Sequence, residues 1–291
     1  MWGGSSDDIC NRFFDKPLQF IFTPNSMTFL NGEHSLLDGQ PVGILTFWML
    51  KREQMNKGDF SGQLDQKLNE PYHLPFELNE ELHSSLRMAY QNFKDLIDNT
   101  SLTLFDYKTY GNKFIGTILK TSPDTFVQIA LQLAYFQQQN KFCACYEPIS
   151  MKHFNYGRTE TCRSLTKECK DFVLSVLDDN LPPETKKQLF YKAVDAQRQY
   201  IKEGKKGKGI DRHLLGLKLL MIENNEPLHP LFKDPVFINS STWRLSTSPY
   251  LTPMFLTSAF GPVVPDGYGI TYKIKEDEIF FHIANWKDCA A

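Results

Sequence analysis

Helical patterns fill the middle of this 291-residue sequence, and strand-like patterns lie near both ends. The clearest helix opens at Asn79 and repeats apolar residues at helical spacing to Asn99. Capping residues and periodicity predict further helices over 41–53, 111–119, 125–141, 164–178, 183–203 and 211–220. Apolar and aromatic runs bounded by turn residues predict strands over 17–22, 27–30, 102–107, 142–146, 243–248 and 254–260, then a hairpin over 267–284. This order of elements predicts an α/β or α+β fold with a mixed sheet.

Four local features add detail to this outline. The helix from Pro41 is apolar along most of its length, so we expect it to be largely buried. We expect the apolar face of the 79–99 helix to lie in the core, and Asp211 to cap the helix that follows it. The segment 157–161 and the basic stretch 204–209 are expected to be loops.

A polar segment over about 54–78, which contains several Gly and Pro residues, predicts a linker. We therefore expect three parts: 1–10, which is Gly/Ser-rich and resembles a tag or a clipped terminus, then 11–75, then 76–291. The sequence contains no apolar run of 18 residues that predicts a membrane span, and we find no targeting signal.

Charge and cysteine spacing exclude two classes of function. The 32 basic and 34 acidic side chains give a net charge of −2, which argues against a non-specific nucleic-acid binder. The six cysteines are scattered without the spacing of a zinc site or a disulfide framework, which favours a reducing compartment and predicts no metal.

His34 is the first candidate for chemistry. It precedes the carboxylate of Asp38 by four residues in a short polar turn between a predicted strand and a predicted helix, where a general base is well placed. The alternative is that His34, one of seven histidines, is an ordinary surface or structural residue.

Three further clusters carry polar groups. Lys113 and Lys120 lead into the helix start Ser122-Pro123-Asp124, which suits a phosphate group or is simply a capped helix with surface lysines. The guanidinium of Arg212 could clamp a carboxylate or form a structural ion pair. In the triplet Ser246-Thr247-Ser248, alternate hydroxyls share a face of a strand, and Ser248 could donate to an oxyanion.

Taken in order, these motifs resemble those of the carnitine/choline acyltransferase family. The motifs are Glu33-His34-Ser35 with Asp38, Ser122-Pro123-Asp124, Gly157-Arg158-Thr159-Glu160-Thr161, Asp211 to Gly216, Ser246-Thr247-Ser248 and Phe260 to Gly269. The resemblance covers nearly the whole chain from Asn11. Members of the family are longer than this chain, and the part that it resembles is the C-terminal half of a fungal-type member. It implies the CoA-dependent acyltransferase fold of the chloramphenicol acetyltransferase type, with two similar halves and a tunnel between them.

The resemblance also implies a division of labour. Residues 11–75 would end the half that bears the catalytic histidine, and 76–291 would form the C-terminal domain that binds CoA and carnitine. His34 would take the proton from the carnitine hydroxyl, Asp38 would orient His34, and Ser248 would contact the oxyanion. The CoA-binding positions would be Lys113, Lys120, Ser122, Asp124, Ser150 and Arg198. The carnitine-binding positions would be Tyr146, Thr159 and Arg212 for the carboxylate and Phe260 for the trimethylammonium group.

Substrates and location follow from the same resemblance. Arg212 with Thr159 favours carnitine over choline, which has no carboxylate. Ser258 stands where acetyl-specific members carry a bulky Met, so it leaves room for longer acyl chains, although acetyl is the expected group. Acyl-CoA and L-carnitine would be the substrates, with no covalently bound cofactor, and the compartment would be mitochondrial or peroxisomal. The alternative is a catalytically incomplete fragment that folds, can bind CoA and self-associates in place of a missing N-terminal half.

Overall fold

The computed structural model describes residues 11–35, 37–55, 69–70, 72–250 and 255–289. The chain divides into two compact units. The first unit comprises residues up to Asn99 together with 251–256, and the second comprises Thr100–Tyr250 and Thr257–Ala291. The division expected after residue 75 falls inside the first unit, and it stays a prediction about function.

The first unit contains a hairpin and two helices. Strands β1 (Leu18–Phe22) and β2 (Thr28–Gly32) pair antiparallel, with Ser26 at φ 63° in the turn between them. Helix α1 spans Gly39–Met55, and helix α2 spans Glu80–Asn99. The predicted strand pair and both predicted helices are confirmed. The linker expected between the helices lies mostly outside the described residues.

The expectation that these two helices are buried is wrong. Neither α1 nor α2 has a buried residue, and Trp48 and Leu86 are 57% and 54% exposed. An apolar helix surface is buried only when another layer covers it.

The second unit is built on a mixed six-stranded sheet in the order β3-β8-β7-β6-β4-β5. Its strands are β3 (Thr100–Tyr107), β4 (Cys145–Ser150), β5 (Thr159–Cys162), β6 (Leu245–Pro249), β7 (Tyr268–Ile274) and β8 (Ile279–Trp286). The pairs β4–β6 and β6–β7 are parallel, and the other three are antiparallel. The predicted fold with a mixed sheet and the predicted C-terminal hairpin are confirmed.

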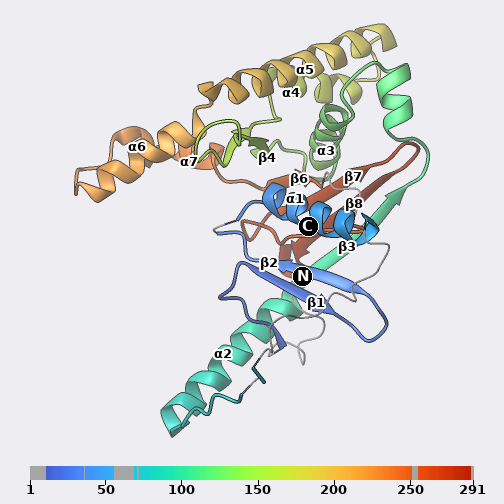
Figure 1. The fold of residues 1–291 in the computed structure, drawn as a ribbon. Helices are drawn as coiled ribbons and strands as arrows, with labels where there is room; N and C mark the ends of the chain where they lie inside the picture. Colours follow the sequence, from blue (N-terminus) through green and yellow to red (C-terminus); the bar gives the residue numbers. More distant parts are fainter. Residues whose placement is uncertain (1–10, 36, 56–68, 71, 251–254, 290–291) are drawn as a thin grey trace. The chain divides into compact units, whose positions relative to one another are not determined.

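Three helices pack together beside this sheet (Figure 1). They are α3 (Pro123–Gln139), α4 (Lys167–Val176) and α5 (Pro183–Glu203), and their shared core is formed by Ile129, Cys169, Val173, Ala193 and Val194. A second core, which includes Tyr135, Leu245 and Ile270, joins α3 to the sheet. The sequence predicts all three helices to within a few residues.

Shorter elements complete the unit, and several correct the predictions. Phe114–Ile118 and Gly204–Lys208 form single π-helical turns, although Gly207 in the basic stretch has a non-helical φ of 79°. Helix α6 spans Asp211–Glu223, and the short helices η4 (Pro230–Lys233), α7 (Pro235–Ser240) and η5 (Lys287–Cys289) follow later.

Two expectations about strands and loops are wrong. Thr159–Cys162, in a segment expected to be a loop, is strand β5, because its polar residues hide the apolar alternation by which strands are recognised. Residues 255–260, expected to be a strand, have no strand pairing, and 251–254 lie outside the described residues. No described helix is both long and apolar enough to cross a bilayer.

Candidate active site

His34 and Asp38 belong to the first unit, in the connection from β2 to α1. The His34 side chain is 75% exposed, and its Nδ1 atom lies 3.9 Å from Oδ1 of Asp38. This distance allows ionic attraction but exceeds that of a hydrogen bond. Next to them, the Glu33 carboxylate accepts hydrogen bonds from the backbone and hydroxyl of Ser35, which lower the pKa of Glu33. The catalytic roles of His34 and Asp38 stay predictions.

Strand alternation places six hydroxyl-bearing residues of the second unit on one side of its sheet. Tyr146, Ser150, Thr159, Ser246, Ser248 and Thr271 lie on this side, which we call the hydroxyl face. The register pairs Tyr146 with Ser246, Ser150 with Thr159, and Ser248 with Thr271. Residues on the other side of the sheet, such as Leu245 and Ile270, pack against α3.

Arg212, Thr159 and Tyr146, predicted to hold one carboxylate, lie together. The Nη2 atom of Arg212 donates to Oγ1 of Thr159 at 3.3 Å and to the hydroxyl of Tyr146 at 3.4 Å. Its Nε donates to the Thr159 carbonyl at 3.0 Å. The side chain of Arg212 is exposed, so a bound anion can reach the guanidinium. A cation flanked by two hydroxyls is suited to a carboxylate.

The segment that carries Phe260 lies against the hydroxyl face at β7. An added Cβ on Gly269, the register partner of Ser246, would lie 2.5 Å from the carbonyl oxygens of Phe260 and Gly261. Only a glycine permits so close an approach of two backbones. The structure therefore brings Phe260 to the strand next to Ser246 and Ser248.

His282 fixes the start of the same segment from β8. Its Nε2 lies 2.8 Å from the hydroxyl of Thr257, and its Nδ1 lies 3.3 Å from Oγ1 of Thr271. Thr271 in turn donates to the carbonyl of Ser258, the residue expected in the acyl pocket. Burial lowers the pKa of His282, so the imidazole stays neutral at neutral pH. We read it as a structural residue.

The segment expected to bind CoA phosphates is ordered around the start of α3. Ser122 is the N-cap of α3, and its Oγ accepts from the backbone of Thr125 at 3.4 Å. Lys113 is 64% exposed and lies 3.7 Å from Glu276, and Lys120 adopts a φ of 51°. The predicted cap is confirmed, and binding of CoA stays a prediction.

Asp124, from the same motif, heads a buried chain of hydrogen bonds. Its Oδ1 accepts from the hydroxyl of Tyr272 at 2.6 Å. The side-chain amide of Gln128 donates to Tyr272 and to the hydroxyl of Thr247 at 3.0 and 2.9 Å. Thr247 donates to the carbonyl of Tyr146 at 2.7 Å. This series of hydrogen bonds thus links the start of α3 to β4. Strand β4 carries Tyr146, which accepts a hydrogen bond from Arg212.

Glu147 is a buried carboxyl group next to this chain. Its side chain accepts from Gln197 of α5 at 3.3 Å. Burial raises the pKa of Glu147 well above its usual range, and a hydrogen bond with Asp124 and that group's charge add to the effect. The folded state therefore favours the protonated, neutral form of Glu147.

The two remaining CoA candidates lie on different elements. Arg198 is an exposed residue of α5, with its Nη1 atom 3.6 Å from Asp195. Ser150 ends β4 beside Thr159, so the structure places it near the predicted carnitine positions. Helix α5 also contacts the segment before Lys120, because the hydroxyl of Tyr191 donates to the carbonyl of Leu119 at 2.9 Å.

Sequence reasoning missed the surroundings of Arg212. Asp211 does not cap α6, whose N-cap is Ile210, but pairs with Arg163 at 2.6 Å. Trp243, expected only to begin a strand, packs against Tyr146 with ring centroids 5.8 Å apart. The sequence signal for the Arg163–Asp211 pair is an arginine directly after the polar segment 159–162. This signal is informative only when that segment is recognised as strand β5.

The described residues hold no group of three or more His, Cys, Asp or Glu side chains that could bind a metal. Cys143, Cys145, Cys162 and Cys169 are free and buried, and burial raises the pKa of each thiol, so these groups are unreactive.

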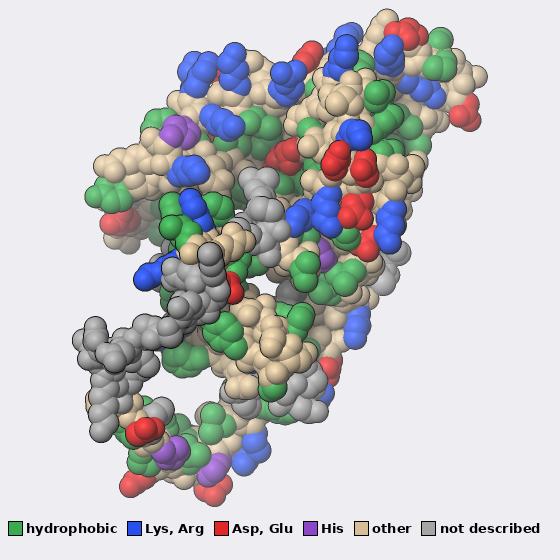
Figure 2. All heavy atoms as spheres, turned by 45° about the vertical axis from the view of Figure 1, so that its right-hand side comes forward, with side chains coloured by type: hydrophobic (Ala, Val, Ile, Leu, Met, Phe, Trp, Pro, Cys, Tyr) green, Lys and Arg blue, Asp and Glu red, His purple; other side chains and the backbone are tan. Residues whose placement is uncertain are grey.

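Figure 2 shows acidic and basic side chains side by side on one face of the molecule.

Comparison with known proteins places this geometry in a family. Carnitine O-acetyltransferase of Rattus norvegicus is 35% identical over 288 residues, which are 99% of this chain and 46% of the relative. Carnitine O-acetyltransferase, mitochondrial, of Saccharomyces cerevisiae is 33% identical over 291 residues, covering 98% of this chain and 42% of the relative. Choline O-acetyltransferase of Gallus gallus is 33% identical over 290 residues, covering 99% and 45%.

The chain therefore spans less than half the length of the relatives that it matches. The family model described as Choline/Carnitine o-acyltransferase matches residues 1–291, which is every residue of the chain. The mixed α/β fold agrees with that match. This chain belongs to the choline/carnitine O-acyltransferase family.

Proposed function

We propose that this chain supplies most of the acceptor and CoA sites of a carnitine O-acyltransferase. The enzyme transfers a short acyl group, acetyl first of all, reversibly between CoA and the carnitine hydroxyl. The observation that carries the proposal is the contact of Arg212 with Thr159 and Tyr146, because carnitine has a carboxylate for this cation and choline has none.

In this proposal the reaction is a direct transfer. His34 accepts the proton of the carnitine hydroxyl, and the oxygen attacks the thioester carbonyl of acetyl-CoA. Ser248, on the hydroxyl face, donates to the oxyanion that forms. Collapse of the intermediate expels the CoA thiolate, which takes the proton back from His34. Asp38 stabilises the protonated imidazole.

The other binding roles follow the same scheme. Lys113, Lys120, Ser122, Asp124, Ser150 and Arg198 bind CoA, and Phe260 packs against the trimethylammonium group. Ser150 pairs with Thr159 in the sheet. Ser258 gives the acyl pocket room for chains longer than acetyl. A mitochondrial location is proposed because the Saccharomyces cerevisiae relative is named as mitochondrial, and a peroxisomal one stays an alternative.

Acceptor choice tests the proposal. Acyl transfer is measured as thiol release from acetyl-CoA with L-carnitine or with choline, in the complete protein that carries this sequence. A higher kcat/KM for L-carnitine is expected. A preference for choline would overturn the assignment of the Arg212 site.

A second candidate is a catalytically incomplete fragment that folds and self-associates. It is favoured by the exposed apolar side chains of α1 and α2 and by the coverage of less than half of each relative. The 291-residue chain is assayed with acetyl-CoA and carnitine while its mass is measured by light scattering. Turnover by a monomer would remove this candidate, and an inactive oligomer would favour it.

A further inference from the structure

We propose that Arg163 is a positioning residue for the carboxylate clamp: it fixes the first turn of α6, from which Arg212 reaches Thr159 and Tyr146. The inference rests on the proposed function, because it assigns a role in binding the carboxylate of the acceptor. Arg163 does not itself touch the acceptor in this scheme. It acts through Asp211 and Trp243.

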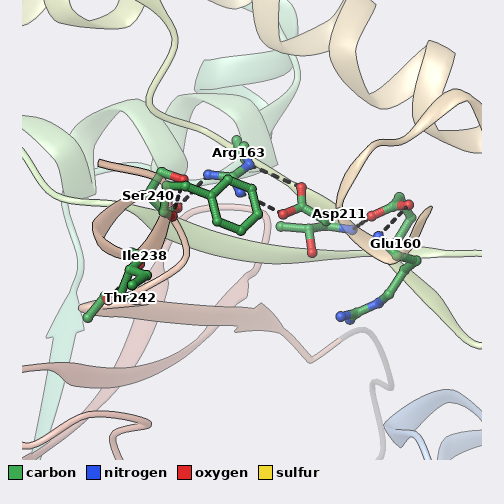
Figure 3. A network of polar contacts seen from close by, with 9 residues as sticks. Glu160, Arg163, Asp211, Ile238, Ser240 and Thr242 are labelled. Atoms are coloured by element: carbon green, nitrogen blue, oxygen red, sulfur yellow. Dashed lines mark hydrogen bonds and ion pairs between the residues drawn. The ribbon is translucent and has the colours of Figure 1, made fainter. Parts of the chain in front are cut away.

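The contact between Arg163 and Asp211 is bidentate. Arg163 directly follows β5, and Asp211 is the first residue of α6. Nη2 and Nε of Arg163 donate to the two carboxylate oxygens of Asp211 at 2.6 and 3.0 Å. Nη1 donates to the carbonyl of Ser240 at the end of α7, as Figure 3 shows. One guanidinium thus ties together a strand and two helices.

This ion pair is largely shielded from water. The side chains of Arg163 and Asp211 are 22% and 10% exposed. Exposed ion pairs contribute little, whereas removing one partner of a shielded pair leaves a charge without compensation. Breaking the Arg163–Asp211 pair would therefore be costly, so the two side chains keep this geometry.

The first turn of α6 depends on such contacts, because its N-cap, Ile210, makes no capping hydrogen bond through its side chain. Besides the Arg163–Asp211 pair, the backbone N–H of Arg212 donates to Oε2 of Glu160 at 3.4 Å. The chain before the helix also packs tightly on Glu160, since a Cβ on Gly209 would lie 2.3 Å from its Cγ. Two residues of one segment, Glu160 and Arg163, thus orient the turn that carries Arg212.

Arg163 also supports the second partner of the clamp. Its guanidinium carbon lies 4.8 Å from the centre of the Trp243 ring. Trp243 in turn packs against the ring of Tyr146, whose hydroxyl accepts from Arg212. Arginine stacks on aromatic rings while its N–H groups remain free to donate, and lysine cannot match both contacts.

The test separates carboxylate binding from general damage. The complete protein is titrated with γ-butyrobetaine, which has the carboxylate but no reacting hydroxyl, and with its methyl ester, which lacks the negative charge. Arg163→Lys should weaken binding of γ-butyrobetaine about tenfold, the effect of a charged hydrogen bond, and leave binding of the ester unchanged. Asp211→Asn should act in the same direction and serves if Arg163→Lys does not fold.

Arg244→Lys is the matched control. Arg244 is 23% exposed, and its guanidinium bonds to Asp266 at 2.6 Å and to Asn239 of α7 at 3.1 Å rather than to Asp211. Arg244→Lys should leave the affinity for γ-butyrobetaine and for its methyl ester unchanged. Equal losses for acid and ester in Arg163→Lys, or no loss for either, would overturn the positioning role.

Arg212→Gln separates the role of Arg163 from the carboxylate-binding role of Arg212. If it weakens binding of the acid and Arg163→Lys does not, the clamp stands and the inference about Arg163 fails. If Arg212→Gln has no effect on the acid, the proposed function itself fails.

Discussion

The Nη2 atom of Arg212, at the start of α6, lies 3.3 Å from the hydroxyl oxygen of Thr159 in β5. The two residues are 53 positions apart in the sequence, and the side chain of Arg212 is exposed. A cation held in one orientation by strand groups binds a carboxylate with less loss of side-chain entropy than a free one. Acceptor binding should therefore be sensitive to this contact.

Replacing Arg212 by Gln should raise the KM for carnitine by a factor that corresponds to about 2–5 kcal/mol, because a charged contact to a carboxylate is lost. The KM for acetyl-CoA should change little. Initial rates with each substrate varied in turn measure both constants. Arg198→Gln should show the opposite pattern, and equal effects on the two KM values in Arg212→Gln would contradict the clamp.

Replacing His34 by Ala should lower kcat by about 10²–10⁴, the usual contribution of a general base, while CoA binding is kept. Thiol release and calorimetric titration with CoA measure the two properties. His83→Ala, which changes an exposed histidine of the same unit, should have no effect. Turnover retained in His34→Ala would show that another group takes the proton.

Replacing Glu147 by Gln should make the stability of the protein less dependent on pH above the ordinary carboxyl pKa. The raised pKa of Glu147 means that the folded state keeps a proton that the unfolded state loses above pH 4.5. Stability is therefore lost as pH rises from that value, by about 1.4 kcal/mol per pH unit, up to the folded pKa. In urea unfolding from pH 4 to 8, the free energy of unfolding of the variant should rise relative to that of the parent as the pH rises. A difference independent of pH would mean that Glu147 is ionised in the fold.

Replacing His282 by Gln should have the opposite pH signature. Burial lowers the pKa of His282, so the unfolded state binds a proton below pH 6.5 that the folded state does not. The parent then loses stability as pH falls through 6.5, and the variant lacks this loss. Thermal unfolding between pH 5 and 8 tests the sign. His153→Gln is the comparison, since His153 is an exposed histidine whose Nε2 lies 2.6 Å from the carbonyl oxygen of Lys205.

Replacing Gly269 by Ala should destabilise the second unit by about 1–3 kcal/mol, the usual cost of overpacking, because the added Cβ meets the backbone of Phe260 and Gly261 at 2.5 Å. Activity should fall as well, since the segment that carries Phe260 must move. Unfolding and initial rates measure the two effects. Gly216→Ala in α6, where nothing lies within 4 Å, should be neutral or stabilising.

Much of this fold follows from local patterns. Helices α3 and α5 show apolar periodicity and a proline at the start, and the C-terminal hairpin alternates around a polar turn, so their positions are predictable. Strand β5 is not, because Glu160 and Thr161 are polar yet buried, and their burial depends on partners distant in sequence. Burial of α1 was predicted from composition alone, but burial depends on what covers a helix.

The candidate site is likewise predictable from the sequence only in part. The motif that contains Arg212 is local, and so its candidate role could be read from the sequence. Its partners Thr159 and Tyr146 came from the family resemblance, and the structure supplies the contacts among all three. Arg163 and Asp211 face each other only after β5 and α6 have folded together, so no spacing rule reveals that pair.

Helix α6 is oriented through its first turn, and none of its 13 residues is buried. The far end of this helix can therefore carry a reporter without disturbing the core. A fluorophore attached at residue 223, after Glu223→Cys, would sit at the tip of a rigid rod whose base holds Arg212. A tilt of the first turn of α6 on ligand binding would be carried along the helix to residue 223, where fluorescence could follow it.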